Sequence, residues 1–280
     1  MDIAVRRRAG LIVTYVILAL LLLFMVFPVL VTITNSFMPG WQVAEYKDPA
    51  AVSKALMLIP EQVTLGQYSS VLLYNEMYWV YFWNSVILTA PIVAGQLIVS
   101  ALAAYFFTFM KNRFKEVLFF IYIVVMLLPF QVTLVPAYLT IDSLGLMDTR
   151  LGIILPGIFS TFGAFLLRMH MEQVPKNYIE AARMDGAGHL RIFWYIAAPM
   201  CKAGIVALCI LCFIDNWNMI EQPLIFLKDP LTQPLSLFFY SINQRAITIA
   251  FAASTIYMIP MLLVFMNGEK ELMEGIRGLK

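Results

Sequence analysis

The segment Tyr178–Pro199 reads YIEAARMDGAGHLRIFWYIAAP and lies between two long apolar runs. Its spacing is set by the triplet Glu-Ala-Ala at 180–182, then three residues and Gly186, then nine residues and Ile196, with Pro199 shortly after. A polar, charged stretch in this position is typical of a membrane protein that exposes one shaped segment outside the bilayer. We interpret the segment as a handle by which another protein can move the membrane-embedded part.

The composition around this segment is that of a membrane protein. The chain has 280 residues, of which 61% are hydrophobic and 13% are charged, and its mean hydropathy is +0.82. A soluble domain carries about 25% charged residues. The deficit indicates a lipid bilayer as the main solvent, and the net charge of +2 is too small to imply binding to nucleic acid.

Six stretches are long and apolar enough to cross a bilayer, which takes about 20 mostly apolar residues in a helix. Together they predict an all-α membrane protein with one domain over residues 1–280. The first stretch is read as a retained helix because it is longer than the apolar part of a signal peptide. The predicted spans cover approximately residues 11–33, 82–110, 117–138, 151–171, 204–221 and 247–267.

The distribution of Lys and Arg predicts the orientation of the spans, because cytoplasmic segments carry the excess of these residues. With the N-terminus inside, fourteen of them are cytoplasmic and five are external. The cytoplasmic residues are Arg6, Arg7, Arg8, Lys111, Arg113, Lys115, Arg168, Lys176, Arg183, Arg191, Lys202, Lys270, Arg277 and Lys280. The external residues are Lys47, Lys54, Arg150, Lys228 and Arg245. Both termini and the segment 172–202 are therefore predicted to be cytoplasmic.

The segment 175–199 is predicted to form a short helix with defined ends. Pro175 suits the start of a helix and Asn177 suits an N-cap. Glu180 is then expected in the first turn, where the helix dipole favours a negative charge. Asp185-Gly186 predicts a turn at the helix end, because glycine adopts positive φ there at little cost, and Pro199 predicts a second break.

Two small residues in this helix, Ala181 and Ala182, allow another surface to approach it closely. The alternative is a connecting helix that touches only its own chain. For an arbitrary loop that alternative would be favoured, but the fixed spacing described above favours a docking segment.

At this point the chain resembles a known family, the permease subunits of binding-protein-dependent ABC importers. The family pattern is Glu-Ala-Ala, three residues, Gly, nine residues, Ile, one residue, Leu-Pro. The chain departs from it only at Ala198, which stands in place of Leu. By resemblance the segment would be the coupling helix seated on an ATPase subunit. The residues assigned to this coupling role are Glu180, Ala181, Ala182, Asp185, Gly186, Ile196 and Pro199.

The resemblance extends to other parts of the chain. The stretch 81–85 (YFWNS), the stretch 216–218 (NWN) and the tail 267–280 are similar to the sugar-transporter branch, and the short N-terminus with six spans to its smaller, second permease subunit. The family implies the type I importer architecture in a bacterial or archaeal cytoplasmic membrane. It also implies a second permease in a heterodimer, an ATPase dimer and an external solute-binding protein.

The chain has no GxxxxGK[ST] sequence, the loop that cradles the phosphates of ATP. We therefore expect this chain to bind no cofactor and to act as a transport subunit, with ATP and Mg²⁺ on the separate ATPase. No Ser-His-Asp arrangement, paired carboxylates beside a base or HExxH spacing predicts an enzyme. A polytopic membrane enzyme is accordingly disfavoured.

Polar residues in the predicted fifth span mark a candidate substrate pathway. An acidic residue at the middle of a bilayer costs roughly 2.5–3.5 kcal/mol, so such residues face a partner or a water-filled cavity. The alternative, which stays open here, is that the carboxylates are hydrated at the outer interface. Asn84, Gln96 and Ser100 are weaker candidates, since single amides often serve helix packing. The candidate pathway residues are Asp215, Asn216, Trp217, Asn218 and Glu221 in the fifth span, with Gln131 in the third.

Two other functions stay open at this stage. One is an ABC permease for another solute, such as glycerol phosphate or a polyol. The other is a self-sufficient secondary transporter, which would be active in liposomes without an ATPase. The absence of inverted repeats counts against the second.

Overall fold

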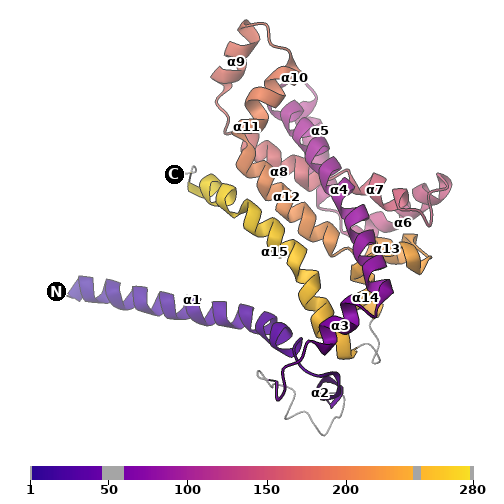
Figure 1. Ribbon diagram of the computed structural model, residues 1–280. Helices are drawn as coiled ribbons and strands as arrows, with labels where there is room; N and C mark the ends of the chain where they lie inside the picture. Colours follow the sequence, from indigo (N-terminus) through magenta and orange to yellow (C-terminus); the bar gives the residue numbers. More distant parts are fainter. Residues whose placement is uncertain (1, 46–59, 242–246, 278–280) are drawn as a thin grey trace. The chain divides into compact units, whose positions relative to one another are not determined.

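The computed structural model describes residues 2–45, 60–241 and 247–277, and all regular elements in these ranges are helical (Figure 1). The chain divides into two compact units, residues 1–78 with 241–259 and residues 79–240 with 260–280. Unit 1 contains α1 (Asp2–Asn35), α2 (Gly40–Glu45), α3 (Gly66–Leu72) and the start of α15 (Ile247–Arg277).

Unit 2 contains most of α4, the rest of α15 and a series of shorter helices. In chain order, the first helices of the unit are α4 (Glu76–Phe109), α5 (Lys115–Met126), α6 (Phe130–Ser143), α7 (Leu151–Gly157) and α8 (Thr161–Met171). It continues with α9 (Lys176–Met184), α10 (His189–Ile192), the π-helix η2 (Phe193–Ala197) and α11 (Ala198–Met200). It ends with α12 (Lys202–Trp217), α13 (Glu221–Phe226), the 3₁₀ turn η3 (Pro230–Thr232) and α14 (Leu235–Ser241).

Unit 1 is held together by side chains that bind backbone carbonyls. Gln67 in α3 is buried, and its Nε2 donates to the carbonyls of Asn35 and Met38, both at 2.8 Å. The Tyr78 hydroxyl donates to the carbonyl of Ala253 at 3.1 Å. By contrast, the apolar window of α1 has none of its residues buried within the chain. The side chains of that window, in Gly10–Asn35, are therefore free to contact lipid or another subunit.

Four of the six predicted spans are helices long and apolar enough to cross a membrane: Gly10–Asn35, Glu76–Phe109, Leu151–Met171 and Ile249–Met273. The other two predicted spans lie within bent pairs, and the fifth corresponds to the second helix of its pair. Lys115–Met126 and Phe130–Ser143 meet at 102°, and His189–Met200 and Lys202–Trp217 meet at 80°. The structure thus offers up to six spans when each bent pair is one span.

The predicted third span is not one continuous helix. It is divided at residues 127–129 into α5 and α6, and Pro129 has an extended conformation with ψ of 140°. Proline has no N–H to donate and its ring crowds the carbonyl four residues earlier, so a helix breaks there readily. Pro136 and Pro260 lie inside α6 and α15 without ending either helix.

The predicted fifth span also has different bounds. The helix α12 ends at Trp217, and Asn218 is its C-cap, whereas the predicted span continued to Glu221. Glu221 instead begins the separate short helix α13. The polar residues 215–218 therefore lie at a helix end, where free backbone carbonyls are satisfied by side chains or water.

Glycines allow the helices of unit 2 to pack closely. A Cβ placed on Gly204 in α12 would lie 2.6 Å from Cγ of His170 in α8. A Cβ on Gly95 in α4 would lie 2.6 Å from Cγ1 of Ile158. Small residues of this kind bring backbones together in membrane helix bundles.

Two buried clusters mark the two ends of unit 2. The first, built around Tyr105, Ile179 and Phe193, joins α4 to the segment 175–201. The second, built around Leu88 and Phe226, joins α4 to α7 and α13. We call the region with residues 105–116, 168–202 and 271 the α9 end. We call the region with residues 84–88, 144–153 and 218–236 the α13 end.

Candidate coupling segment and substrate pathway

The helix α9 begins one residue after Pro175, whose backbone is extended at the N-cap position. Pro175 therefore starts the helix as predicted. The prediction that Asn177 is the N-cap is wrong, because Asn177 lies inside the first turn. Glu180 consequently lies in the second turn, since the first turn contains no acidic residue.

The C-terminus of α9 is closed by a Schellman motif. The N–H of Ala187 donates to the carbonyl of Ala182, and the N–H of Gly186 donates to the carbonyl of Arg183, both at 3.0 Å. Gly186 has φ of 79°, a conformation in which a side chain would be strained. The predicted turn at Asp185-Gly186 is confirmed.

The two faces of α9 have different roles. Ile179 is buried and Ala182 is half-buried, and both pack on the cluster that includes Tyr105 and Phe193. On the opposite face, Glu180 and Ala181 are exposed. Spacings of three and four residues place side chains on one face of a helix. The Glu-Ala-Ala triplet is thus divided between a docked inner side and an open outer side.

The inner side of α9 also carries a polar contact to α4. Nη2 of Arg183 donates to the carbonyl of Phe109, the last residue of α4, at 3.0 Å. The last carbonyls of a helix have no partner within it, and the helix dipole is negative there. Arg183 therefore caps α4 with a positive charge.

The remaining motif residues lie at the C-terminus of α9 and after it. Asp185 and Gly186 are exposed, Ile196 is half-buried in the π-helix η2, and Pro199 is exposed in α11. The predicted break at Pro199 is displaced, because the chain stays helical through Pro199 and bends at Cys201. The wide π-helical turn ends two residues before the proline, whose missing N–H and bulky ring must be accommodated by the preceding turn.

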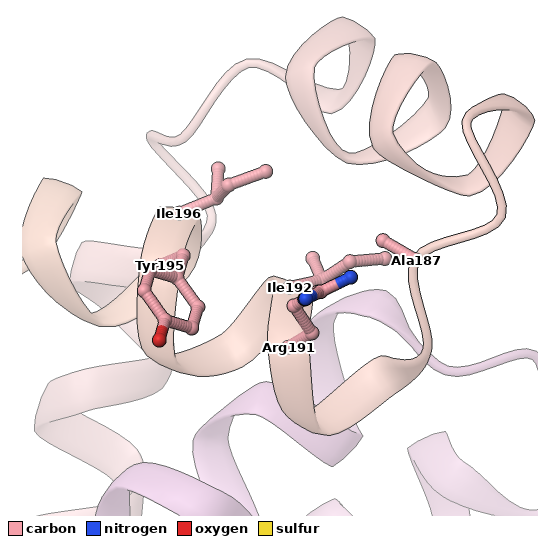
Figure 2. A pocket seen from close by; sticks show the side chains of 5 residues that line it. All are labelled: Ala187, Arg191, Ile192, Tyr195 and Ile196. Atoms are coloured by element: carbon pink, nitrogen blue, oxygen red, sulfur yellow. The ribbon is translucent and has the colours of Figure 1, made fainter.

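A hollow of about 350 Å³ opens beside η2. Figure 2 shows its lining side chains, from the turn after α9 and from α10 and η2. The hollow lies between two motif positions, because its lining includes Ala187, which follows Gly186, and Ile196. Its lining residues are Ala187, Arg191, Ile192, Tyr195 and Ile196.

The candidate pathway residues do not all lie in one environment. Asp215, Asn218, Glu221 and Gln131 are exposed on the surface of this chain, and Asn216 is half-buried. Trp217 is 1% exposed, and its ring lies 5.4 Å from the ring of Phe213 and 5.8 Å from that of Phe82. Within this chain Trp217 is therefore part of the core.

Asn216 belongs to a polar network that crosses three helical segments. Its Nδ2 lies 3.4 Å from Oε1 of Gln96 and donates to the carbonyl of Cys212 at 2.8 Å. Gln96 in turn donates to the carbonyl of Gly157 at 2.7 Å. Both amides thus satisfy groups inside the bundle, which is the packing role that single amides often have in membranes.

Sequence reasoning missed several residues that the structure brings together. Arg168 in α8 donates to Glu116 at 3.0 Å and to Glu172 at 2.9 Å, and its guanidinium carbon lies 3.8 Å from the Phe119 ring centroid. The Arg168–Glu172 spacing of four residues was a visible signal. Nothing in the sequence indicated the contact with Glu116, 52 positions away.

Asn84 is a second residue whose role is clear only in the structure. It is 2% exposed, and its Nδ2 donates to the carbonyls of Leu231 at 2.7 Å and Gln233 at 3.0 Å. Its Oδ1 accepts from Nη2 of Arg150 at 2.7 Å. All the hydrogen-bonding groups of this amide are engaged, so Asn84 fixes the loop before α14 on the α13 end of α4.

A turn beside this loop holds a charged group. Asp148 has φ of 59°, and its carboxylate accepts the N–H groups of Asp229 at 3.1 Å and Lys228 at 2.8 Å. These two backbone hydrogen bonds hold the pKa of the Asp148 carboxyl below its ordinary value. In the described ranges, no group of three His, Cys, Asp or Glu side chains is arranged to hold a metal ion.

Comparisons with known proteins agree with this architecture. A bacterial ABC transporter involved in the import of the acidic polysaccharide alginate contains a chain of the same fold, with a TM-score of 0.80 and 25% identity over 94% of this chain and 96% of that chain. The lactose transport system permease protein of Rhizobium radiobacter is 30% identical over 203 residues, covering 70% of this chain and 73% of that protein.

Two further relatives are similar over different lengths. The arabinooligosaccharides transport system permease protein of Halalkalibacterium halodurans is 26% identical over 257 residues, 90% of this chain and 89% of that protein. The sn-glycerol-3-phosphate transport system permease protein of Yersinia enterocolitica is 32% identical over 147 residues, 52% of each. Residues 96–268 match the family described as binding-protein-dependent transport system inner membrane component. The chain belongs to this family, and it is a multi-pass membrane permease subunit of an ABC importer.

Proposed function

We propose that this permease serves the import of a sugar or oligosaccharide, driven by ATP hydrolysis on a separate ATPase that grips α9. The supporting observation is the division of α9 into two faces. Ile179, Ala182 and Arg183 attach the helix to its own bundle. Glu180 and Ala181 remain exposed on the other face. A helix attached on one side and open on the other suits the transfer of movement from a partner.

The partners proposed for this chain follow from the family. A second permease completes a heterodimer, an ATPase dimer binds ATP and Mg²⁺, and a solute-binding protein delivers the substrate outside the cell. The chain itself contains no phosphate-binding GxxxxGK[ST] loop, which supports placing ATP on another subunit. Because the outer face of α9 carries Glu180 and the small side chain of Ala181, it suits a close-fitting groove.

The orientation proposed is the one with both termini in the cytoplasm of a bacterial or archaeal cell. The excess of Lys and Arg in the segments then assigned to the cytoplasm supports it. In this orientation the α9 end of unit 2 is cytoplasmic and the α13 end is external.

The proposed cycle begins when a loaded binding protein docks on the external face. Closure of the ATPase dimer on ATP then pulls on α9. This movement rocks the third to sixth spans from an inward-open to an outward-open arrangement. The fifth span, with Asp215, Asn216, Asn218 and Glu221 at and after the end of α12, then lines part of the path of the substrate.

A neutral sugar is favoured over a phosphate ester by the chemistry of these residues. The candidate pathway positions carry two carboxylates and several amides, which hydrogen-bond to hydroxyl groups, but no Lys or Arg. Recognition of a phosphate normally uses arginine or lysine. The similarity to glycerol-3-phosphate permeases over 52% of the chain keeps that substrate as the second candidate. Uptake of labelled lactose or an arabinooligosaccharide in competition with glycerol 3-phosphate separates the two.

The first test is affinity purification of the chain in mild detergent. Co-isolation of an ATP-hydrolysing subunit and a second membrane subunit is expected. Transport by the chain alone in liposomes, driven by an ion gradient, would contradict the proposal and favour a secondary transporter.

The second test uses Gly186→Trp, which places a bulky side chain at an exposed turn with positive φ. Sugar uptake is expected to be lost while the protein remains in the membrane. Gly145→Trp is a matched control, because Gly145 also has positive φ and no atom within 4 Å of an added Cβ, but lies at the α13 end. Intact uptake in Gly186→Trp would exclude the coupling role.

A further inference from the structure

The helix α4 connects the two ends of unit 2 as one continuous element. It runs from Glu76 to Phe109 and stays helical through Pro91 (Figure 1). Asn84 and Phe109 are separated by about 37 Å along this helix at about 1.5 Å per residue. A helix is stiff over this length, so a displacement at one end is felt at the other.

At the α9 end, α4 is attached to the coupling segment by polar contacts, in addition to the ring contacts of its Phe107 with α5. Arg183 caps the carbonyl of Phe109 at 3.0 Å, and the Arg183 Nε is buried without a hydrogen-bond partner among the described atoms. The Tyr105 hydroxyl lies 3.3 Å from Nδ1 of His189, and its ring meets that of Phe193 edge-on at 5.6 Å. Arg183 thus attaches α9 to α4, and Tyr105 attaches α10 and η2 to the same helix.

At the α13 end, α4 is attached to a loop by direct hydrogen bonds. Asn84 binds the carbonyls of Leu231 and Gln233 and accepts from Arg150, as described above. The next residue of α4, Ser85, accepts the N–H of Leu235 through its Oγ at 2.8 Å. Three hydrogen bonds therefore attach residues 231–235 to α4, while the start of the same loop binds Asp148.

We propose that α4 carries the movement of α9 to the external loop 227–235, with Arg183 and Asn84 as the positioning residues at its two ends. The proposal rests on the function proposed above and adds the route inside this chain. Coupling between distant sites needs a physical element that both sites displace, and α4 is attached to both by hydrogen bonds. By reciprocity, the state of the loop then also biases the position of α9.

The test measures the response of the loop to nucleotide on the other side of the membrane. Lys228→Cys places a reporter on the exposed loop, and the complex with its co-purified ATPase is reconstituted in liposomes. Labelling by a membrane-impermeant maleimide is timed with and without Mg-ATP plus orthovanadate. The ratio of the two rates is the response.

Four variants are compared in this background. Arg183→Met and Asn84→Asp are each expected to reduce the response by about 5-fold or more, the lower bound of typical allosteric coupling. Asn84→Asp keeps the acceptor for Arg150 but loses the donor to the loop. Arg183→Lys, which retains a charged donor, is expected to restore most of the response. Lys111→Met removes an exposed cation close to Phe109 and is expected to change nothing.

The double variant Arg183→Met with Asn84→Asp distinguishes one route from two. If α4 is the route, the double variant loses little more than either single variant, because both break the same element. Multiplied losses, or a full response in either single variant with the ATPase still bound, would overturn the proposal. Failure of any ATPase to co-purify with the Lys228→Cys parent would instead remove the proposed function itself.

Discussion

The two ends of unit 2 are held by different chemistry. At the α9 end, the cations of Arg168, Arg183 and Lys202 reach carboxylates or a carbonyl at helix ends. At the α13 end, side chains such as those of Asn84 and Ser236 bind backbone atoms in irregular segments. One end thus joins helix to helix, and the other gives shape to a loop.

This difference has a mechanical consequence. Coulomb attraction falls slowly with distance, whereas a neutral hydrogen bond weakens steeply when its length or angle changes. Contacts of the first kind survive small displacements of one helix against another. Contacts of the second kind preserve one conformation. The α9 end is therefore suited to movement during a transport cycle, and the α13 end is suited to presenting a surface of constant shape.

The largest expected effect comes from Arg168→Met, which removes the cation between α5 and α8. The variant loses charge-assisted hydrogen bonds to Glu116 and Glu172 and the contact with the Phe119 ring. We expect a loss of about 2–3 kcal/mol in the free energy of unfolding, since hydrogen bonds to charged groups contribute ~1.5–3 kcal/mol. Thermal unfolding in detergent and hydrogen exchange of α5 measure it.

Lys115→Met is the control for this variant, because its ammonium lies 3.8 Å from the same Glu116. A much smaller loss is expected there, since exposed pairs contribute little. Exchange in the loop 227–235 is expected to stay unchanged in Arg168→Met. A comparable increase at both ends would show that the two ends are not held separately.

Much of the local structure of this molecule was predictable from short-range sequence signals. The turn at Gly186 follows from the conformational freedom of glycine, whereas a missing N–H alone did not show that the third span divides at Pro129 and stays helical at Pro136. The long apolar helices follow from hydropathy alone. These features depend on residues within a few positions of each other, so the sequence contains them directly.

The features that sequence reasoning missed depend on residues far apart in the chain. Arg183 and Phe109 are 74 positions apart, and Asn84 and Leu231 are 147 apart. A local sequence pattern cannot predict a contact between residues so far apart in the chain. Trp217 illustrates the same limit, because its polar sequence neighbours indicated a cavity while its ring packs against Phe213 and Phe82.

A smaller effect, confined to the loop, is expected from acidification at the α13 end. The pKa of Asp148 is lowered by the N–H groups of Asp229 and Lys228. The stabilisation is therefore complete above the ordinary aspartate pKa and is lost as the pH falls through the lower value in the folded protein. Hydrogen exchange of residues 226–233, corrected for intrinsic rates, should rise below about pH 4. Asp148→Asn should remove most of this pH dependence, and an unchanged profile would exclude the carboxylate as its cause.

The smallest effect is expected from Glu271→Gln, which weakens the ion pair of Glu271 with Lys202. Oε1 of Glu271 lies 2.9 Å from Nζ of Lys202, but the Glu271 side chain is 24% exposed and that of Lys202 is 67% exposed. Such a pair contributes about 0.2–1 kcal/mol and is screened by salt. Raising the salt concentration to about 1 M, where the Debye length is about 3 Å, should increase hydrogen exchange near the end of α15 and leave the loop 227–235 unchanged. Glu269→Gln, on the same helix and exposed, should not alter this salt response, whereas Glu271→Gln should abolish it. If salt instead loosens the loop as much as α15, the contrast between the two ends fails, because the loop would then also depend on ion pairs between exposed side chains.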